Sequence, residues 1–311
     1  GLMLAGPRGI GKATLAFRFA SFLLAHPDAG SAEVSDAPDL TIDGQSRIAR
    51  LVARLAHPDL TVIRHDMFPE ENRSGEIKVE HVRWALSRLS TVADAGGWRV
   101  CIIDSADDLN RNAANALLKA LEEPPPRTVM LLVTHHPRRL AATLRSRCIT
   151  VELSPPPLDE AMKAVASTQP DLAGDADLEA LVALADGAPG QALHLASLGG
   201  IELHDRLKSI LDNLPKLDVG DIHALAVELG NQRASERFGL FMDMLQVELS
   251  RVAGDIARHG GPARALEPWI ELWDKVSRAY DDTMALNLDR KQLILTACFG
   301  LETAARKSAP H

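Results

Sequence analysis

Short apolar runs recur along the first half of the chain and alternate with longer segments whose apolar residues return at helical spacing. Apolar runs of this length are typical of strands that are buried on both faces of a parallel sheet. The predicted strands are LMLA (2–5), LTVIRH (60–65), WRVCIID (98–104), TVMLLVT (128–134) and CITVEL (148–153). The predicted helices are KATLAFRFASFLLA (12–25), RIARLVARL (47–55), IKVEHVRWALSRLSTVA (77–93) and NAANALLKALEE (112–123). The pattern therefore predicts an α/β domain whose parallel sheet is covered by helices on both faces.

The second half of the chain has a different pattern. Beyond the proline-rich segment SPPPLDE (154–160), which we interpret as a hinge, every segment has helical spacing. This change predicts an α/β domain at 1–153, a small helical domain at 154–200 and a larger helical domain at 201–311.

The composition narrows the class of protein. The chain has 311 residues, a formal net charge of −8 and a pI near 5.8, so its surface as a whole is not suited to gripping nucleic acid. Its three cysteines (Cys101, Cys148 and Cys298) are far apart, which predicts a reducing compartment, no disulfide framework and no zinc site. No apolar run reaches the roughly 18–20 residues of a membrane span, and no signal peptide is visible. Because the chain opens on an apolar strand without an initiator Met, we expect its natural N-terminus to be missing.

The segment GPRGIGKAT (6–14) lies between the first predicted strand and the first predicted helix. Such a turn presents backbone N–H groups to phosphates, its lysine adds charge, and a Ser or Thr after the lysine holds Mg²⁺. The residues that fit this pattern are Gly6, Gly9, Gly11 and Lys12. Ala13 occupies the metal-ligand position, and Thr14, although we include it in the candidate loop, lies about 100° further around a helix. We predict a degenerate nucleotide-binding loop without Mg²⁺-dependent hydrolysis, in which Lys12 either holds a nucleotide weakly or stabilises the loop.

A second feature of phosphoryl-transfer folds is an apolar strand that ends in an Asp supporting Mg²⁺. The segment CIIDSADDLN (101–110) supplies Asp104 at that place, although an Asp can also simply end a core strand. The next residue is Ser105, whose hydroxyl is a poor general base near neutral pH. We expect Asp107 and Asp108 to cap the following segment.

Two further segments carry a family resemblance. NAANALLKALEEPPPRT (112–128), followed by TLRSRC (143–148), resembles the clamp-loader branch of the AAA+ proteins, which are subunits of bacterial DNA polymerase III. The resemblance implies an AAA+ P-loop domain with a parallel sheet, followed by a small helical lid domain and an all-helical C-terminal collar domain that serves oligomerisation. It also implies a pentameric arc that opens a ring-shaped sliding clamp and places it on primed DNA, with ATP bound at subunit interfaces.

The Ser-Arg-Cys segment carries the chemistry that this resemblance implies. Arg147 would be an arginine finger that reaches into the nucleotide site of the adjacent subunit, and Ser146 and Cys148 would fix the segment that aims it. Such a finger stabilises charge on the transferring phosphoryl group and is worth on the order of 10³ or more in rate. Without the resemblance, Arg147 would be interpreted as a solvated arginine at the start of a strand.

The chain departs from the pattern of the active members of this family. Ala13 replaces the Mg²⁺-binding hydroxyl, Ser105 replaces the Glu that activates water, and the run at 187–190 lacks the arginine that senses the γ-phosphate. Thr134 keeps a hydroxyl where a polar sensor residue is expected, and the cysteine-free region 28–57 must lack the zinc module of many bacterial relatives. These departures agree with a subunit that donates its finger and does not hydrolyse ATP itself.

The resemblance also implies partners and a location. The partners would be the motor subunits gamma/tau and the delta subunit. The chain would contact the sliding clamp only indirectly and primed DNA only through the complex. It would have no contact with a membrane and would be located in the cytoplasm. No cofactor would be required, although weak binding of ATP or ADP stays open. The chain would not be catalytic on its own but would belong to a DNA-directed DNA polymerase, a nucleotidyltransferase.

Two other functions stay open at this point. One is a catalytically active gamma/tau-type clamp-loader ATPase with unusual substitutions. The other is a stand-alone P-loop transferase that depends on a nucleotide, which gives no account of the Ser-Arg-Cys segment.

Other conspicuous residues have simpler explanations. The triple proline of LEEPPP (121–126) forces the chain out of the helix, and His135-His136 has no third metal ligand at a suitable spacing. The helically spaced aromatic residues of the last domain should pack in its core or at a subunit interface; they are Trp269, Trp273 and Tyr280.

Overall fold

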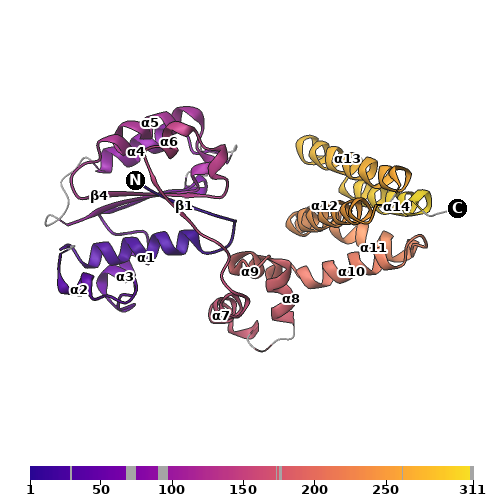
Figure 1. Cartoon of the computed structure of the whole chain (residues 1–311), viewed down its shortest axis with the longest axis horizontal. Helices are drawn as coiled ribbons and strands as arrows, with labels where there is room; N and C mark the ends of the chain where they lie inside the picture. Colours follow the sequence, from indigo (N-terminus) through magenta and orange to yellow (C-terminus); the bar gives the residue numbers. More distant parts are fainter. Residues whose placement is uncertain are drawn as a thin grey trace. The chain divides into compact units, whose positions relative to one another are not determined.

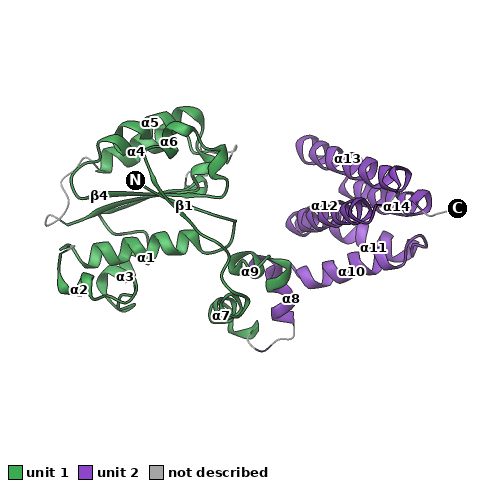
Figure 2. Cartoon of the chain, viewed as in Figure 1, with its two compact units in different colours: residues 1–173, 182–192 green, residues 174–181, 193–311 purple. Residues whose placement is uncertain are grey.

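The computed structural model describes residues 1–28, 30–67, 75–89, 97–172, 174, 177–260 and 262–308. The chain forms two compact units (Figure 2), the first made of 1–173 with 182–192 and the second of 174–181 with 193–311. The sequence predicts three domains with boundaries after residues 153 and 200, which differ from the boundaries of these two units. The three-domain division stays a prediction.

A five-stranded parallel sheet forms the centre of the first unit (Figure 1). Its strands are β1 (Leu2–Ala5), β2 (Leu60–Ile63), β3 (Arg99–Asp104), β4 (Thr128–Thr134) and β5 (Ile149–Glu152). The strand order is β2-β3-β4-β1-β5, which confirms the predicted α/β fold with a parallel sheet. The last strand departs from the expected burial on both faces, because β5 is an edge strand and each of its residues is exposed.

Helices cover both faces of this sheet (Figure 1). One face carries α1 (Lys12–Ala25), α2 (Ala32–Ser35) and α3 (Arg47–Ala53), and the other carries α4 (Val79–Leu89), α5 (Arg111–Glu122) and α6 (Ala142–Arg145). The side chains of β3 alternate between the two cores, since Val100 and Ile102 join the cluster around α1 while Cys101 and Ile103 join the cluster around α4 and α5. This period of two is the reason that a continuous apolar strand needs a helix layer on each side.

The ends of α5 follow from its sequence. The side chain of Asn110 accepts the backbone N–H of Ala113 at 2.9 Å and so begins the helix, while the prolines that follow Glu123 prevent its continuation. The predicted helix at 77–93 corresponds to α4, and residues 90–93 of that prediction lie outside the described residues.

The remaining elements are helical, as the sequence predicts. They are α7 (Leu158–Thr168), α8 (Asp177–Leu184), α9 (Pro189–Ser197), α10 (Gly200–Asp212), α11 (Val219–Leu229), α12 (Ser235–Arg258), α13 (Ala263–Leu286) and α14 (Arg290–Ser308). Short 3₁₀ turns occur at η1 (His65–Met67), η3 (Ala106–Asp108), η4 (Pro137–Arg139), η5 (Pro170–Leu172) and η6 (Gln232–Ala234). Among the described residues, none of the helices combines the length and the apolar character that crossing a bilayer requires.

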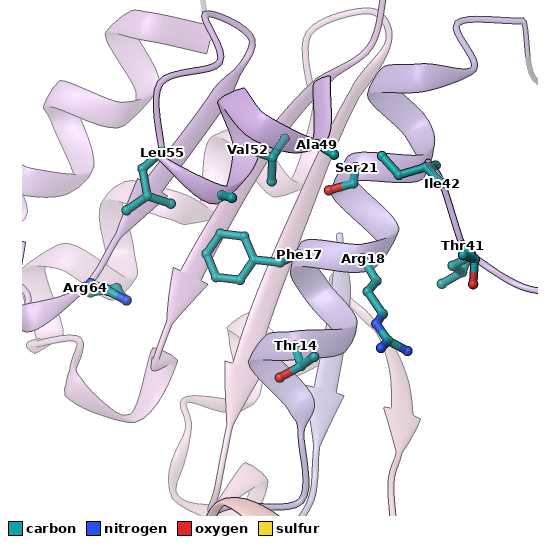
Figure 3. A pocket seen from close by; sticks show the side chains of 12 residues that line it. Thr14, Phe17, Arg18, Ser21, Thr41, Ile42, Ala49, Val52, Leu55 and Arg64 are labelled. Carbon is teal, nitrogen blue, oxygen red and sulfur yellow. The ribbon is translucent and has the colours of Figure 1, made fainter. Parts of the chain in front are cut away.

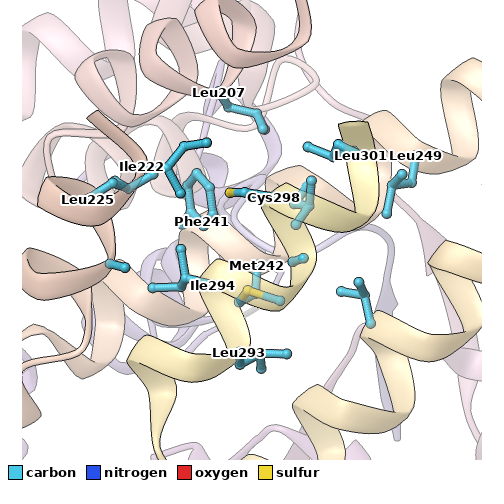
Figure 4. Packing of buried hydrophobic residues seen from close by; sticks show 14 of the residues in the cluster. Leu207, Ile222, Leu225, Phe241, Met242, Leu249, Leu293, Ile294, Cys298 and Leu301 are labelled. Carbon is cyan, nitrogen blue, oxygen red and sulfur yellow. The ribbon is translucent and has the colours of Figure 1, made fainter. Parts of the chain in front are cut away.

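The second unit has its own apolar core, built from α10 to α14 (Figure 4). Phe241 and Met242 of α12 pack with Ile294 and Cys298 of α14 at its centre. The predicted packing of the aromatic residues is confirmed in part. Trp269 is buried, and the ring of Tyr280, which is half-buried, lies 6.0 Å from the ring of Phe238. Trp273 is 40% exposed, so its predicted place at a subunit interface stays a prediction.

Four alternating charges join α10, α11 and α12, and we call them the collar ion cluster: Glu202, Arg206, Glu228 and Arg237. Arg206 lies 2.6 Å from Glu228, and Arg237 lies 2.9 Å from the same carboxylate and 3.2 Å from Glu202. Because each charge has two partners of the opposite sign, this cluster is worth more than isolated surface pairs.

Candidate functional site

The predicted site residues fall into two groups, one at the carboxyl ends and one at the amino ends of the parallel strands. The glycine loop follows β1, Asp104 ends β3 and Thr134 ends β4, so all three lie at the edge formed by the carboxyl ends of the parallel strands. Arg147 precedes β5, which pairs with β1 from Leu2↔Ile149 to Ala5↔Glu152. At about 3.3 Å per residue, this paired stretch alone separates the two edges by about 10 Å. The structure therefore does not bring Arg147 together with the loop of its own chain.

The conformation of the loop requires glycine at two positions. A Cβ on Gly6, whose φ is 153°, would lie 2.2 Å from the carbonyl oxygen of Leu153. A Cβ on Gly9, whose φ is 81°, would lie 2.7 Å from the backbone nitrogen of Gln191. Backbone atoms approach the loop too closely for any side chain at these positions.

Lys12 points back into its own loop. Its Nζ donates to the carbonyl oxygen of Gly6 at 2.7 Å and to that of Pro7, and the residue is 3% exposed. Burial lowers the pKa of Lys12, while the carboxylates of Asp107 and Asp104 oppose that shift. An amine held in this way stabilises the loop through two of its own carbonyl groups.

The loop also contacts the segment that carries the altered sensor position. The backbone N–H of Gly190, in the first turn of α9, donates to the carbonyl oxygen of Gly9 at 2.8 Å. A Cβ on Gly190 would lie 2.9 Å from that oxygen, so the two backbones meet directly. The segment 187–190 thus closes on the loop through main-chain atoms and offers no guanidinium to it.

A cavity of about 500 Å³ lies beside Asp104, and its lining residues include Arg8, Arg64, Ser105 and His135. Burial raises the pKa of Asp104, although Arg64 and His135 oppose the shift. The hydroxyl of Ser105 donates to Asp108 at 3.3 Å and is therefore engaged within the chain. In the described part of the chain, no cluster of three or more His, Cys, Asp or Glu side chains is placed to bind a metal ion.

Asp107 links the ends of β3 and β4, a role that the sequence analysis missed. Its carboxylate accepts the hydroxyl of Thr134 at 3.0 Å and the backbone N–H groups of His135 at 2.6 Å and His136 at 3.0 Å. Burial alone would raise the pKa of Asp107, but these hydrogen bonds outweigh it and hold the pKa below its ordinary value. The expectation that Asp107 caps the next segment was therefore wrong. The sequence signal for this role was weak: Asp107 follows shortly after the end of β3, and the neighbouring strand β4 ends in the hydroxyl residue Thr134.

Thr14 faces a different cavity from that beside Asp104. It lines a pocket of about 710 Å³ between α1 and α3, together with Phe17 and Arg18 (Figure 3). Its assignment to the candidate nucleotide loop stays a prediction.

At the opposite edge, Arg147 is held by contacts with its own chain. Its Nε donates to Oε1 of Glu122 at 2.5 Å, and its Nη1 donates to the carbonyl oxygen of Thr143 at 2.9 Å. Ser146 lies 3.4 Å from Nη1, so it does contact the arginine that it was predicted to position. Cys148 is half-buried, and burial raises the pKa of its thiol. Glu122 was not among the predicted site residues.

Comparison with known proteins gives one family. Residues 1–157 match the family described as DNA polymerase III, delta subunit. DNA polymerase III subunit delta' of Pseudomonas aeruginosa is 34% identical over 215 residues, which are 69% of this chain and 60% of that protein. The Escherichia coli protein of the same name is 31% identical over 278 residues, which are 85% of this chain and 78% of that protein.

A shorter similarity extends to a second type of subunit. DNA polymerase III subunit tau of Escherichia coli is 38% identical over 84 residues, which are 27% of this chain and 13% of that protein. The chain thus spans less than two thirds of the Pseudomonas relative and a small part of the tau subunit.

Proposed function

Since this chain belongs to the DNA polymerase III delta' family, we propose that it is a clamp-loader subunit that does not hydrolyse ATP and that lends Arg147 to a neighbouring ATPase subunit. In this proposal it helps to load the sliding clamp on primed DNA during replication. Its Ser-Arg-Cys segment supplies positive charge to the phosphoryl group that is transferred in the site next door.

One observation carries the proposal. Arg147 lies at the amino edge of the sheet, whereas the glycine loop of the same chain lies at the carboxyl edge. An arginine in that position has no route to its own loop without unfolding β5, so any nucleotide that it meets belongs to another subunit.

The state of the chain's own loop supports the second half of the proposal. Hydrolysis requires a Mg²⁺ ligand after the lysine, a base beside the acidic strand and cationic contacts to the γ-phosphate. The chain has Ala13 and Ser105 at the first two places, and Lys12 is turned into the loop carbonyls. The first two requirements fail for separate chemical reasons, and we therefore propose that no cofactor is required and that ATP or ADP binds weakly at most.

We propose the gamma/tau motor subunits and the delta subunit as direct partners. The sliding clamp and primed DNA are then reached through the complex, and the protein works in the cytoplasm. The short stretch of identity with a tau subunit agrees with assembly from related chains. A stand-alone transferase fits poorly with membership in this family, and an active gamma/tau-type ATPase is the rival that direct measurement must exclude.

The test replaces the guanidinium in the assembled complex. Arg147→Ala should lower the ATPase rate of a complex reconstituted with motor subunits by on the order of 10³ at the site that it serves, with assembly unchanged by gel filtration. Arg139→Ala is the matched control, because Arg139 is an exposed arginine that lies on η4, outside the Ser-Arg-Cys segment. An unchanged rate for Arg147→Ala, or an equal loss for both variants, would contradict the proposal.

A further inference from the structure

The guanidinium of Arg147 has an acceptor for each of its three nitrogen atoms. Nε and Nη2 both contact Oε1 of Glu122, and Nη1 donates to the carbonyl oxygen of Thr143 and to the hydroxyl of Ser146. The Nε–Nη2 edge is one of the edges with which arginine binds carboxylate or phosphate in a bidentate manner. Glu122 therefore occupies one of the guanidinium edges at which a phosphate group can bind.

The position of Glu122 at the end of α5 favours a nearby cation. Glu122 is the last residue of α5, and Glu123 follows it as the C-cap. Carboxylates at a helix C-terminus face the negative end of the helix dipole, where cations are preferred. The last turn of α5 contains one cation of its own, Lys119, and Arg147 adds a second from 25 residues further along the chain through tertiary structure.

We propose that Glu122 holds Arg147 in a resting position and competes with the neighbour's phosphates for the same guanidinium edge. This inference rests on the proposed function of Arg147 as a finger. While Glu122 is bound, its negative charge neutralises the guanidinium that should stabilise the transferring phosphoryl group. Docking of the neighbouring nucleotide displaces the carboxylate and makes the full positive charge available.

The exposure of the pair makes this exchange easy. The side chains of Arg147 and Glu122 are 31% and 47% exposed, and ion pairs at this exposure are weak and are screened by salt. A nucleotide presents several charged oxygens in place of one carboxylate, so it is the stronger competitor. Glu122 is thus a positioning residue that acts through Arg147.

The test compares variants of the full chain in complexes reconstituted with the motor subunits. Glu122→Gln keeps the shape of the side chain and removes its charge, and it should raise the ATPase rate by about two- to fivefold, the factor that matches an exposed ion pair. The gain should appear in kcat/KM for ATP, because the carboxylate is displaced when the nucleotide binds, and it should shrink as the salt concentration rises. Glu123→Gln is the matched control, because it makes the same charge change one residue away, and its rate should equal that of the wild type.

Further variants separate this inference from the proposal beneath it. Glu122→Gln combined with Arg147→Ala should have the same rate as Arg147→Ala alone. A Glu122→Gln rate equal to or below the wild-type rate, or a further change on the Arg147→Ala background, would overturn the competition while leaving the finger intact. If Arg147→Ala itself has the wild-type rate, the finger proposal fails first, and the competition fails with it.

Discussion

Replacing Asp107 by Asn probes the connection between the ends of β3 and β4. The carboxylate accepts three hydrogen bonds, from the hydroxyl of Thr134 and from the backbone N–H groups of His135 and His136. An asparagine can keep one oxygen acceptor, but its amide N–H₂ must then face at least one of the donors. The substitution therefore removes a charge and replaces at least one hydrogen bond by a contact between two donors.

The magnitude follows from these contacts. Hydrogen bonds to a charged group contribute about 1.5–3 kcal/mol each and those between neutral groups about 0.5–1.5 kcal/mol, so one lost bond and two weakened bonds give about 2–4 kcal/mol. The substitution should lower the free energy of local opening of β4 and of the residues that follow it. An opening free energy lower by that amount corresponds to amide exchange faster by roughly 30- to 1,000-fold.

Hydrogen exchange measured by mass spectrometry on peptides that cover 128–136 reads this opening directly. It avoids the two-state assumption, which a chain with two compact units does not justify. Asp108→Asn is the matched control, because Asp108 accepts a longer bond of 3.3 Å from Ser105 and should change exchange by less than about fivefold. If Asp107→Asn has no larger effect than Asp108→Asn, the reasoning from the hydrogen bonds is refuted.

The stability difference between the wild type and Asp107→Asn should depend on pH. The pKa of Asp107 is lower in the folded chain than its ordinary value of 3.8, so its contribution to stability is complete above that value and is lost as the pH falls through the folded pKa. The difference in the opening free energy of residues 128–136 between wild type and Asp107→Asn, measured by hydrogen exchange, should therefore be constant from pH 7 to about 5 and should shrink below about pH 4.

Two further predictions follow from the loop and from the second unit. In thermal unfolding, Gly9→Ala should destabilise the first unit by about 1–3 kcal/mol more than Gly11→Ala does. Both glycines have a positive φ, but only at Gly9 would an added Cβ meet Gln191, so equal effects would contradict this contact. Arg237→Ala removes one cation of the collar ion cluster and should lower the stability of the second unit by about 1 kcal/mol, and this loss should be smaller in 1 M NaCl. The control is Arg278→Ala, which breaks an exposed pair with Asp274 and should lower the stability by less than half of that amount. Equal losses would argue against the cluster.

The sequence was sufficient for the features that depend on local pattern. The strands followed from apolar runs, α5 from its apolar spacing and its prolines, and the altered loop from Ala13 beside Lys12. Helical geometry places Thr14 about 100° from residue 13, and Thr14 lines a cavity other than the one beside Asp104.

The features that the sequence did not reveal depend on contacts between distant residues. Asp107 meets Thr134 across 27 residues, and Glu122 meets Arg147 across 25, because the parallel sheet and its helices bring these segments together. The exposure of β5 depends on strand order, which an apolar run does not encode. The sequence shows Lys12 but not its hydrogen bonds to the carbonyl oxygens of Gly6 and Pro7, which depend on the folded conformation of the loop.

ATP turnover by the isolated chain in the presence of magnesium is the most direct test of the central claim. We expect no phosphate release above the background without protein, because the chain lacks the hydroxyl after Lys12 and the base after Asp104. Brisk turnover that Lys12→Ala abolishes would show that this chain runs its own nucleotide site, and it would contradict the account.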